Sequence, residues 1–258
     1  MNTKIILILN KEEVLLLGPL TQFLSKNAQH IQAIYHTPFF PPQANKSKYI
    51  KTTLKISNTL YWLKYILRFV RNKILGSVFF PSSWRKRFNL EYLIKYFQLP
   101  FEELLDVNDE IFINKLKEEE VTTIFSLTSQ LYDKDIINIS GLKIYNFHPS
   151  LLPNNKGRWP IFWAIVKGDD HGITCHEINE KIDDGQIVFQ KNLGKLAGNN
   201  IEQVMDLVMK EMPMVMSSVL EMVAKDELNI VLSDQPSFYG KTPGQISIDT
   251  YWSKMKSN

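Results

Sequence analysis

The chain has 258 residues, of which 44% are hydrophobic and 22% are charged, and its formal net charge is +3. This composition excludes an intrinsically disordered chain, and the glycine and proline contents exclude a collagen-like architecture. The single cysteine, Cys175, excludes an intrachain disulfide framework and a multi-cysteine metal site. We therefore expect a reduced, cytoplasmic protein without a metal centre.

The first predicted element is a buried strand at residues 5–9, which read Ile-Ile-Leu-Ile-Leu. This run is too short to span a membrane, and no small-residue cleavage site follows it. We therefore expect neither a secretory signal nor an integral membrane segment.

Positive charge is concentrated between Lys46 and Lys95. This segment holds 12 lysine and arginine residues and one acid, Glu91. Such an excess indicates a polyanionic partner, which could be a nucleotide diphosphate, a polyglutamyl cofactor, a nucleic acid or an anionic membrane. A solvated, lysine-rich surface explains it equally well.

A helix is predicted inside this basic segment, because apolar residues recur every three or four positions. The repeating positions are Leu60, Leu63, Leu67, Val70 and Ile74. Such a stripe can lie on a membrane surface. More often it packs on a sheet, and this is the interpretation that we expect to hold here.

Two further helices are predicted at residues 89–97 and 110–120, and Asn108 or Asp109 can cap the second one. Residues 121–127 are β-branched and apolar, which predicts a buried strand.

An apolar run at 136–139 continues into residues 141–148, for which we predict another strand. The alternation of strands and helices predicts an α/β fold: a Rossmann-like, doubly wound, mostly parallel sheet with helices on both faces.

The later part of the chain has a different pattern. Residues 172–178 and 186–190 read as two strands joined by a polar turn, and 201–224 as a long methionine-rich helix. Residues 234–258 read as a polar tail. We divide the chain into a catalytic core at 1–198 and a C-terminal helix and tail at 199–258.

Several familiar catalytic signatures are missing. The chain has no Gly-x-Gly-x-x-Gly after the first strand, no phosphate-binding loop and no Gly-x-Ser-x-Gly elbow. Its histidines also lack the carboxylate spacing of a zinc site. What remains is Asn146 and His148, which share one face of a strand that Pro149 ends. An amide can hold a developing oxyanion, and an imidazole can move a proton near neutral pH.

A candidate third member lies about 35 residues further along the chain, where Asp183, Asp184 and Gly185 form a predicted turn between two strands. A carboxylate beside His148 would orient the ring and stabilise its protonated form. The same three residues also suit an ordinary β-turn. His176, on the intervening strand, is by itself more typical of a hydrogen-bonded core residue.

Four ordered motifs carry a family resemblance. They are Asn-Phe-His-Pro-Ser-Leu-Leu-Pro at 146–153, Lys-Gly-Arg-Trp-Pro at 156–160, Gly-Ile-Thr-Cys-His at 172–176 and Ile-Asp-Asp-Gly-Gln-Ile-Val at 182–188. Together they resemble the folate-dependent formyltransferase family. The segment Phe-Tyr-Gly-Lys-Thr-Pro at 238–243 most resembles the tail of nucleotide-sugar N-formyltransferases within it.

This resemblance implies transfer of a formyl group from 10-formyltetrahydrofolate, the expected cofactor, to a primary amine. It places the catalytic roles on Asn146, His148 and Asp183, since the family's aspartate lies two residues before the turn glycine. Asn146 would polarise the formyl carbonyl, and His148, oriented by Asp183, would accept a proton. The folate contacts that the resemblance implies are Ser126, Leu127, Leu152, Pro153, His176 and Asp183.

The expected acceptor is a dTDP-, UDP- or GDP-linked amino-sugar used for surface polysaccharide such as O-antigen. Two other acceptors stay open. Methionyl-tRNA formyltransferases carry a C-terminal barrel, for which the residues after Ala224 are too few, and glycinamide ribonucleotide enzymes are usually shorter. A non-catalytic, basic RNA- or membrane-binding module is a third alternative, which the catalytic trio disfavours. We expect no nucleic-acid partner, and by analogy a homodimer through residues beyond Ile201.

Overall fold

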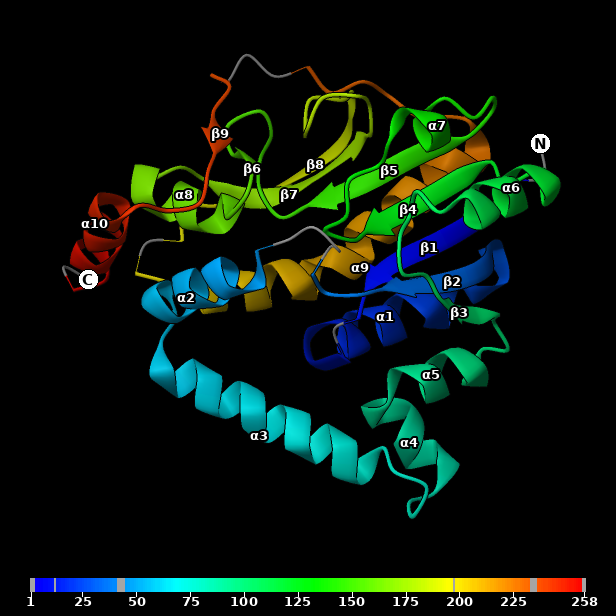
Figure 1. Cartoon of the computed structure of the whole chain (residues 1–258), viewed down its shortest axis with the longest axis horizontal. Helices are drawn as coiled ribbons and strands as arrows, with labels where there is room; N and C mark the ends of the chain where they lie inside the picture. Colours follow the sequence, from blue (N-terminus) through cyan, green and yellow to red (C-terminus); the bar gives the residue numbers. More distant parts are fainter. Residues whose placement is uncertain (1–2, 12, 41–44, 197, 233–235, 257–258) are drawn as a thin grey trace.

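The computed structural model describes residues 3–11, 13–40, 45–196, 198–232 and 236–256. Figure 1 shows a twisted sheet between helices, with the helices of the basic segment below it. In chain order the elements are β1 (Ile5–Asn10), α1 (Glu13–Asn27), a 3-10 turn (Ala28–His30), β2 (Ile31–Thr37), α2 (Lys46–Ile56), α3 (Thr59–Leu75), α4 (Ser82–Phe88), α5 (Leu90–Tyr96), β3 (Phe101–Glu103), α6 (Glu110–Glu118), β4 (Thr123–Leu127), α7 (Lys134–Ile137), β5 (Lys143–His148), β6 (Lys156–Gly157), α8 (Pro160–Lys167), β7 (His171–Glu177), β8 (Ile187–Gly194), α9 (Ile201–Lys225), β9 (Tyr239–Gly240) and α10 (Gln245–Lys256).

Seven of these strands form one sheet in the order β3-β2-β1-β4-β5-β7-β8. The five strands from β3 to β5 are parallel, while β7 pairs antiparallel with β5 and β8 antiparallel with β7. The strand order reverses at β1, where the chain first runs outward to β2 and then returns to β4. In open α/β sheets, ligands bind beyond the carboxyl ends of the strands near such a reversal. The predicted Rossmann-like, mostly parallel sheet is confirmed.

The alternating side chains of β1 divide the interior into two hydrophobic clusters. Ile5, Leu7 and Leu9 belong to the cluster that includes α1 and α9, and Ile6 and Ile8 belong to the cluster that includes α6 and α7. Successive residues of a strand point to opposite faces, so an all-apolar strand must be covered on both sides. The predicted helices on both faces are therefore confirmed, and they hold the strand ends in fixed positions.

Helix α6 begins where the sequence predicts. The carboxylate of Asp109 accepts hydrogen bonds from the backbone N–H groups of Ile111 and Phe112, which are otherwise unpaired at a helix N-terminus. Phe112 and Leu116 are buried on the sheet side. The cap is therefore Asp109, one of the two predicted residues.

The predicted long helix at 201–224 is also confirmed, as α9. Its first turn is closed by a capping box, in which the Asn200 side chain accepts from the N–H of Gln203 and the Gln203 side chain accepts from the N–H of Asn200. Its valines, such as Val208 and Val215, are fully buried against the sheet. Within the described residues, neither α9 nor any other helix has both the length and the apolarity needed to cross a bilayer.

The strand predicted to begin at 136–139 is wrong in its first part. These residues form the end of helix α7 and a turn, and β5 starts only at Lys143. Ile136 is fully buried in the cluster with α6, so its apolar character reflects packing rather than extended backbone. A short apolar run has no periodicity that separates a buried helix turn from a buried strand.

The expectation that the stripe of α3 packs on the sheet is also wrong. Leu63 and Leu67 on that stripe are 54% and 59% exposed. Helices α1 and α9 already cover that face of the sheet, and α3 packs against α1 and α4 instead. Figure 1 shows α3 outside this layer, at the lower left.

The tail at 234–258 contains more regular structure than the sequence indicates, with 234–235 and 257–258 lying outside the described residues. β9 pairs with β6 in a small parallel sheet, and α10 packs on α8 and α2. Tyr251 of α10 is fully buried, and its hydroxyl oxygen accepts a 3.3 Å hydrogen bond from the N–H of Ile201. This segment is therefore part of the folded core.

We expect Tyr251→Ala to lower the free energy of unfolding by about 3–5 kcal/mol, because it leaves a cavity under α10. Ile246→Ala on the same helix is the matched control. Ile246 is 84% exposed, so its loss should change stability by less than about 0.5 kcal/mol. Urea denaturation measures both variants. Equal stability of the two would contradict a structural role for α10.

Candidate active site

The site begins with the pairing of β5 and β7. Their antiparallel register sets Asn146 opposite His176 and His148 opposite Thr174. Asn146, His148 and His176 therefore point to the same face of the sheet, near the carboxyl end of β5. Cys175, one residue away, points into the hydrophobic cluster on the other face.

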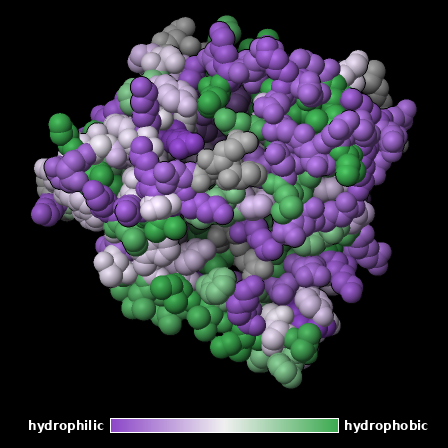
Figure 2. All heavy atoms as spheres, viewed as in Figure 1, coloured by the Kyte–Doolittle hydropathy of each residue, from purple (hydrophilic) through white to green (hydrophobic). Residues whose placement is uncertain are grey.

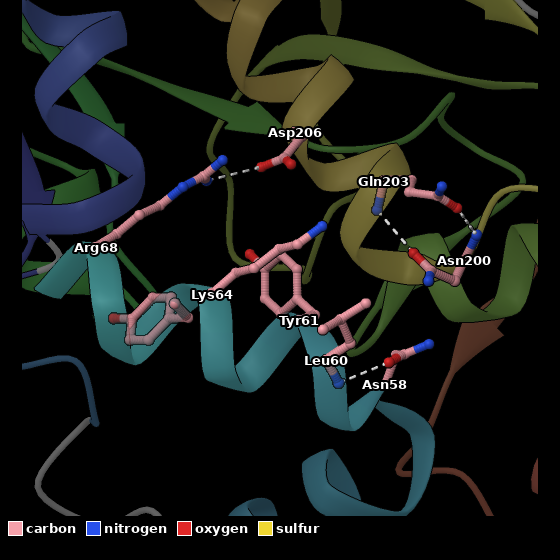
Figure 3. Close-up of a pocket in the computed structure, with 9 residues that line it drawn as sticks. Asn58, Leu60, Tyr61, Lys64, Arg68, Asn200, Gln203 and Asp206 are labelled. Atoms are coloured by element: carbon pink, nitrogen blue, oxygen red, sulfur yellow. Dashed lines mark hydrogen bonds and ion pairs between the residues drawn. The ribbon is translucent and has the colours of Figure 1, made fainter.

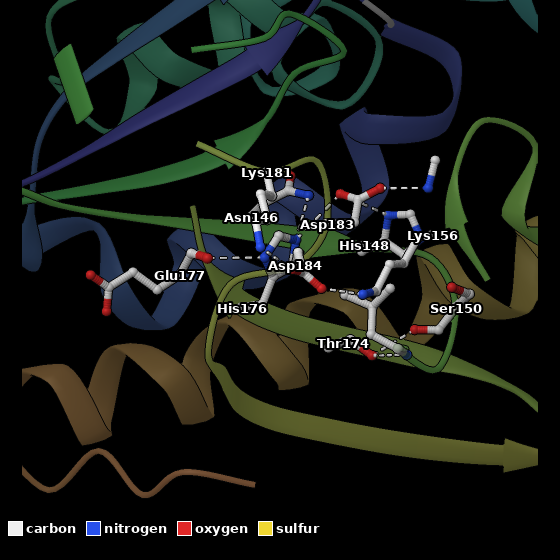
Figure 4. Close-up of polar contacts among 12 residues, drawn as sticks. Asn146, His148, Ser150, Lys156, Thr174, His176, Glu177, Lys181, Asp183 and Asp184 are labelled. Carbon is white, nitrogen blue, oxygen red and sulfur yellow. Dashed lines mark hydrogen bonds and ion pairs between the residues drawn. The ribbon is translucent and has the colours of Figure 1, made fainter. Parts of the chain in front are cut away.

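Asp183 enters this group from the turn between β7 and β8. One carboxylate oxygen lies 3.5 Å from Nε2 of His176 and 3.8 Å from Nδ1 of His148. The other accepts a 2.7 Å hydrogen bond from the N–H of Gly157 in β6. Figure 4 shows the carboxylate between the two rings. Asp183 thus joins three segments that are far apart in the sequence.

The proton on His148 can be assigned from its second ring nitrogen. Nε2 of His148 lies 2.8 Å from the carbonyl oxygen of Asn155, and a carbonyl can only accept, so Nε2 carries the hydrogen. In the neutral ring the free lone pair is then on Nδ1, on the side of Asp183. Burial lowers the pKa of His148 below its ordinary value of 6.5, while the charge of Asp183 and the Asn155 carbonyl act to raise it. His148 is therefore neutral at pH 7, with Nδ1 ready to accept a proton.

Asp183 stays ionised. Burial alone would raise the pKa of this carboxyl, but the neighbouring His176, the positive charge that His148 carries once protonated, and the N–H of Gly157 together lower it to about 2. The carboxylate therefore stabilises a positive charge on His148 once Nδ1 is protonated. The 3.8 Å separation is too long for a direct hydrogen bond, so this stabilisation is between charges.

His176 orients the amide of Asn146. Nδ1 of His176 lies 3.1 Å from the backbone carbonyl of Glu177, so Nδ1 donates and Nε2 of the neutral ring accepts. The group 3.1 Å from Nε2 is the Asn146 side-chain nitrogen, which donates to it. These two contacts establish which side-chain atom of Asn146 is the amide nitrogen. One N–H of the Asn146 amide remains for a second acceptor.

The loop after β5 is tied to the neighbouring strands by Thr174. Its hydroxyl donates to the carbonyl of Ser150 at 2.7 Å and accepts from the N–H of Leu152 at 3.0 Å. Gln190 of β8 donates to the Leu152 carbonyl at 2.7 Å. This loop is therefore held in place before any substrate arrives.

The remaining predicted folate contacts lie around this group. Ser126 is the parallel neighbour of Asn146, but its hydroxyl is buried and accepts a 3.0 Å hydrogen bond from Tyr132. Leu127 ends β4 beside it, Leu152 is buried and Pro153 is partly buried. The side chains of Ser126 and Leu152 are therefore both buried. Their contact with folate stays a prediction.

Two polar groups of the site were missed by sequence reasoning. The carbonyl of Asn155 fixes the tautomer of His148, and its fully buried side chain donates to Asp169 at 3.2 Å. Lys156 forms an ion pair with Asp184, next to Asp183. The only signals were the position of Asn155 beside the motif at 156–160 and that of Lys156 as its first residue. Among the described residues, no group of three or more His, Cys, Asp or Glu side chains could hold a metal ion.

Comparison with known proteins agrees with this geometry. Residues 105–220 match the family model described as Formyl transferase, and they include Asn146, His148 and Asp183. Over these residues the chain is similar to the formyl transferase family. The resemblance predicted from the sequence motifs is thereby confirmed.

The proteins to which this chain is similar differ in the acceptors that their names give. The methionyl-tRNA formyltransferase of Bacteroides thetaiotaomicron is 26% identical over 155 residues, which are 56% of this chain and 48% of that protein. The match thus spans about half the length of that relative. A sugar N-formyltransferase from Shewanella sp FDAARGOS_354 has a TM-score of 0.62 and 17% identity, covering 98% of this chain and 87% of its own. A phosphoribosylglycinamide formyltransferase from Anaplasma phagocytophilum has a TM-score of 0.61 and 13% identity, covering 93% and 98%. At these identities the two structures show a shared fold.

The glycine after the two aspartates is required by the turn. A Cβ on Gly185 would lie 1.6 Å from the backbone oxygen of Glu177. We expect Gly185→Ala to displace the turn and with it Asp183, at a cost of about 1–3 kcal/mol in unfolding free energy.

Gly18→Ala is the control for this variant, because a Cβ there meets nothing within 4 Å and the residue is in an exposed position of α1. This change should be neutral or stabilise by up to about 1 kcal/mol. Urea denaturation compares the two, and NMR of the His148 ring follows the loss of Asp183. An unchanged His148 signal in Gly185→Ala would contradict the assignment.

Proposed function

We propose that this protein transfers a formyl group from 10-formyltetrahydrofolate to the primary amine of a nucleotide-linked amino-sugar. The observation that carries the chemistry is the convergence of Asn146, His148 and Asp183, drawn from β5 and a distant turn, at the carboxyl end of one strand. An amide donor, a neutral imidazole and an ionised carboxylate are the groups that acyl transfer to an amine requires.

The proposed reaction uses each group once. The amine nitrogen attacks the formyl carbon, and the free N–H of Asn146 stabilises the negative charge that develops on the formyl oxygen. The attacking nitrogen loses a proton to Nδ1 of His148, and Asp183 stabilises the resulting imidazolium. The bond between the formyl carbon and N10 of folate then breaks, and His148 returns the proton to N10. The products are a formamide and tetrahydrofolate, so atoms and charge balance.

The position of the C-terminal segment supports an amino-sugar acceptor. The residues at 238–243 that resemble the tail of sugar enzymes include β9, which pairs with β6. β6 contains Gly157, whose N–H binds Asp183. The resembling segment therefore lies one strand from the site, where an acceptor would have to bind. The shared fold with the Shewanella sugar N-formyltransferase extends over 98% of this chain.

The proposed binding region for the nucleotide diphosphate is helix α2 and its surroundings. Tyr49 of α2 stacks on Trp159, two residues after β6, with ring centroids 4.7 Å apart. On the other side of α2, three lysines line a cavity of about 520 Å³ between this helix and the start of α10. They are Lys48, Lys51 and Lys55. Positive charge of this kind suits the diphosphate of a nucleotide-linked sugar.

A methionyl-tRNA acceptor is the second candidate. The match to the Bacteroides thetaiotaomicron methionyl-tRNA formyltransferase favours it, as does the basic segment Lys46–Lys95. Glycinamide ribonucleotide is a third possible acceptor, which the fold shared with the Anaplasma phagocytophilum enzyme leaves open.

A substrate panel tests the acceptor directly. Incubation with 10-formyltetrahydrofolate and dTDP-, UDP- or GDP-linked 3- and 4-amino sugars should give a formamide with at least one of them, detected by mass spectrometry. The corresponding N-acetylated sugars are the control, since they have no free amine. Product with initiator methionyl-tRNA or glycinamide ribonucleotide alone would contradict the amino-sugar assignment. No product with any amine would contradict formyl transfer itself.

The pH profile tests the roles of His148 and Asp183. His148 must be neutral to accept a proton, so kcat/KM should fall as the pH drops through the pKa of His148, which lies below 6.5. Asp183→Asn removes a charge that raises this pKa, so the acid limb should move to still lower pH, and kcat should fall by about 10²-fold or more.

Asp184→Asn is the matched control, because Asp184 pairs with Lys156 rather than with a ring of the site. This variant should leave the acid limb of the kcat/KM profile at the same pH as in the unchanged protein. NMR titration of His148 provides the same comparison without turnover. A limb that moves equally in both variants would contradict the role of Asp183.

A further inference from the structure

Helix α3 turns an apolar face away from the protein. The face consists of residues at helical spacing, with Leu63, Leu67 and Ile74 exposed by 54%, 59% and 56%. The opposite face carries Asn72, which is buried, and Tyr65, which is half-buried. A helix of a globular protein normally has the reverse arrangement, with the apolar stripe inward.

The inner face of α3 is held by polar contacts. Figure 3 shows it across a cavity of about 250 Å³ from the start of α9, with Lys64 and Arg68 on the helix side. Arg68 forms a 3.9 Å ion pair with Asp206. The N–H of Asn58, the cap residue of α3, donates to Glu202 at 2.9 Å. These contacts fix the orientation of α3 about its own axis, and its apolar face therefore points away from the protein.

The exposed surface continues past the end of α3. Phe79, in the turn between α3 and α4, is 91% exposed, and Val78 and Trp84 beside it are 72% and 49% exposed. Figure 2 shows hydrophobic side chains gathered at the lower left, where α3 lies in Figure 1. We call the exposed apolar face of α3, together with the exposed residues of the segment 76–84, the outer apolar surface.

Positive charge is dense in the segment of the chain that contains this surface. The segment Lys46–Lys95 contains 12 basic residues and one acid, and all of it lies in the described part of the chain. On α3, helical spacing sets Arg71 along one edge of the apolar stripe and Lys73 along the other. An apolar stripe between basic edges is the pattern of a helix that lies in the interface of a bilayer, with its cations at the headgroups.

The positive charge of the segment Lys46–Lys95 indicates which kind of partner binds the outer apolar surface. A second copy of this chain would bring the same positive segment against itself, which repels. A nucleic acid would use the cations but would leave the leucines in water. An anionic lipid surface accommodates both the leucines and the cations. We propose that the outer apolar surface docks this protein on an anionic bilayer, with α3 lying parallel to the membrane plane.

Vesicle flotation with the full chain tests this docking. The protein should float with vesicles of phosphatidylcholine and phosphatidylglycerol, and much less with phosphatidylcholine alone. High salt should weaken the binding, because it screens the cations from the lipid charge. The double variant Leu63→Ser, Leu67→Ser should bind at least about tenfold more weakly, since two exposed leucines no longer enter the interface.

Leu105→Ser with Ile111→Ser is the matched control. These two residues are 65% and 80% exposed and lie outside the outer apolar surface. This variant should bind vesicles like the unchanged protein. Both pairs are exposed, so both variants should keep the unchanged melting temperature, which circular dichroism checks.

Four results would overturn the proposal. The first is equal binding to vesicles with and without phosphatidylglycerol. The second is unchanged binding of the Leu63→Ser, Leu67→Ser variant. The third is a concentration-dependent dimer in sedimentation velocity that this variant abolishes, without vesicle binding, since a second copy would then be the occupant. RNA binding that survives in the leucine variant, again without vesicle binding, would assign the cations to nucleic acid.

Discussion

The carboxylate of Asp183 is the interaction on which the site depends. It lies against His148 from β5 and His176 from β7, and it is held by the backbone N–H of Gly157 in β6. Because surrounding donors lower the pKa of Asp183 to about 2, its negative charge persists wherever the protein is folded near neutral pH. One ionised group therefore fixes both the geometry and the electrostatics of the proposed chemistry.

Most of the sheet could be predicted from the sequence, because buried strands such as residues 5–9 and 121–127 have apolar, β-branched runs that few other elements share. The run at 136–139 could not, since four apolar residues suit a helix turn equally well. The stripe of α3 shows a different limit. Periodicity reveals that one face of a helix is apolar. Whether that face packs on the sheet depends on which other helices cover the sheet, and here these are α1 and α9.

The candidate site shows a similar limit, because its side chains could be selected from the sequence and its backbone contacts could not. Asn146 and His148 share a face because strand side chains alternate, so spacing was enough to select this pair. The residues alone left Asp183 and Asp184 open, and the family resemblance selected Asp183. The carbonyls of Asn155 and Glu177, which set the tautomers of the two histidines, could not be selected. Every residue has a carbonyl, so its use leaves no mark on the sequence. Only the folded backbone shows which one faces an imidazole.

The pairing of β6 with β9 has a consequence for how the protein is made. Residues 156–158 exchange backbone hydrogen bonds with residues 238–240, and the first of these segments holds Asp183 in place. During translation, the strand that carries Asn146 and His148, together with β6, emerges from the ribosome well before residues 238–240 do. A nascent chain can therefore build its sheet early and still lack a finished catalytic centre. Competence for chemistry would arrive as a late, separate event in biogenesis.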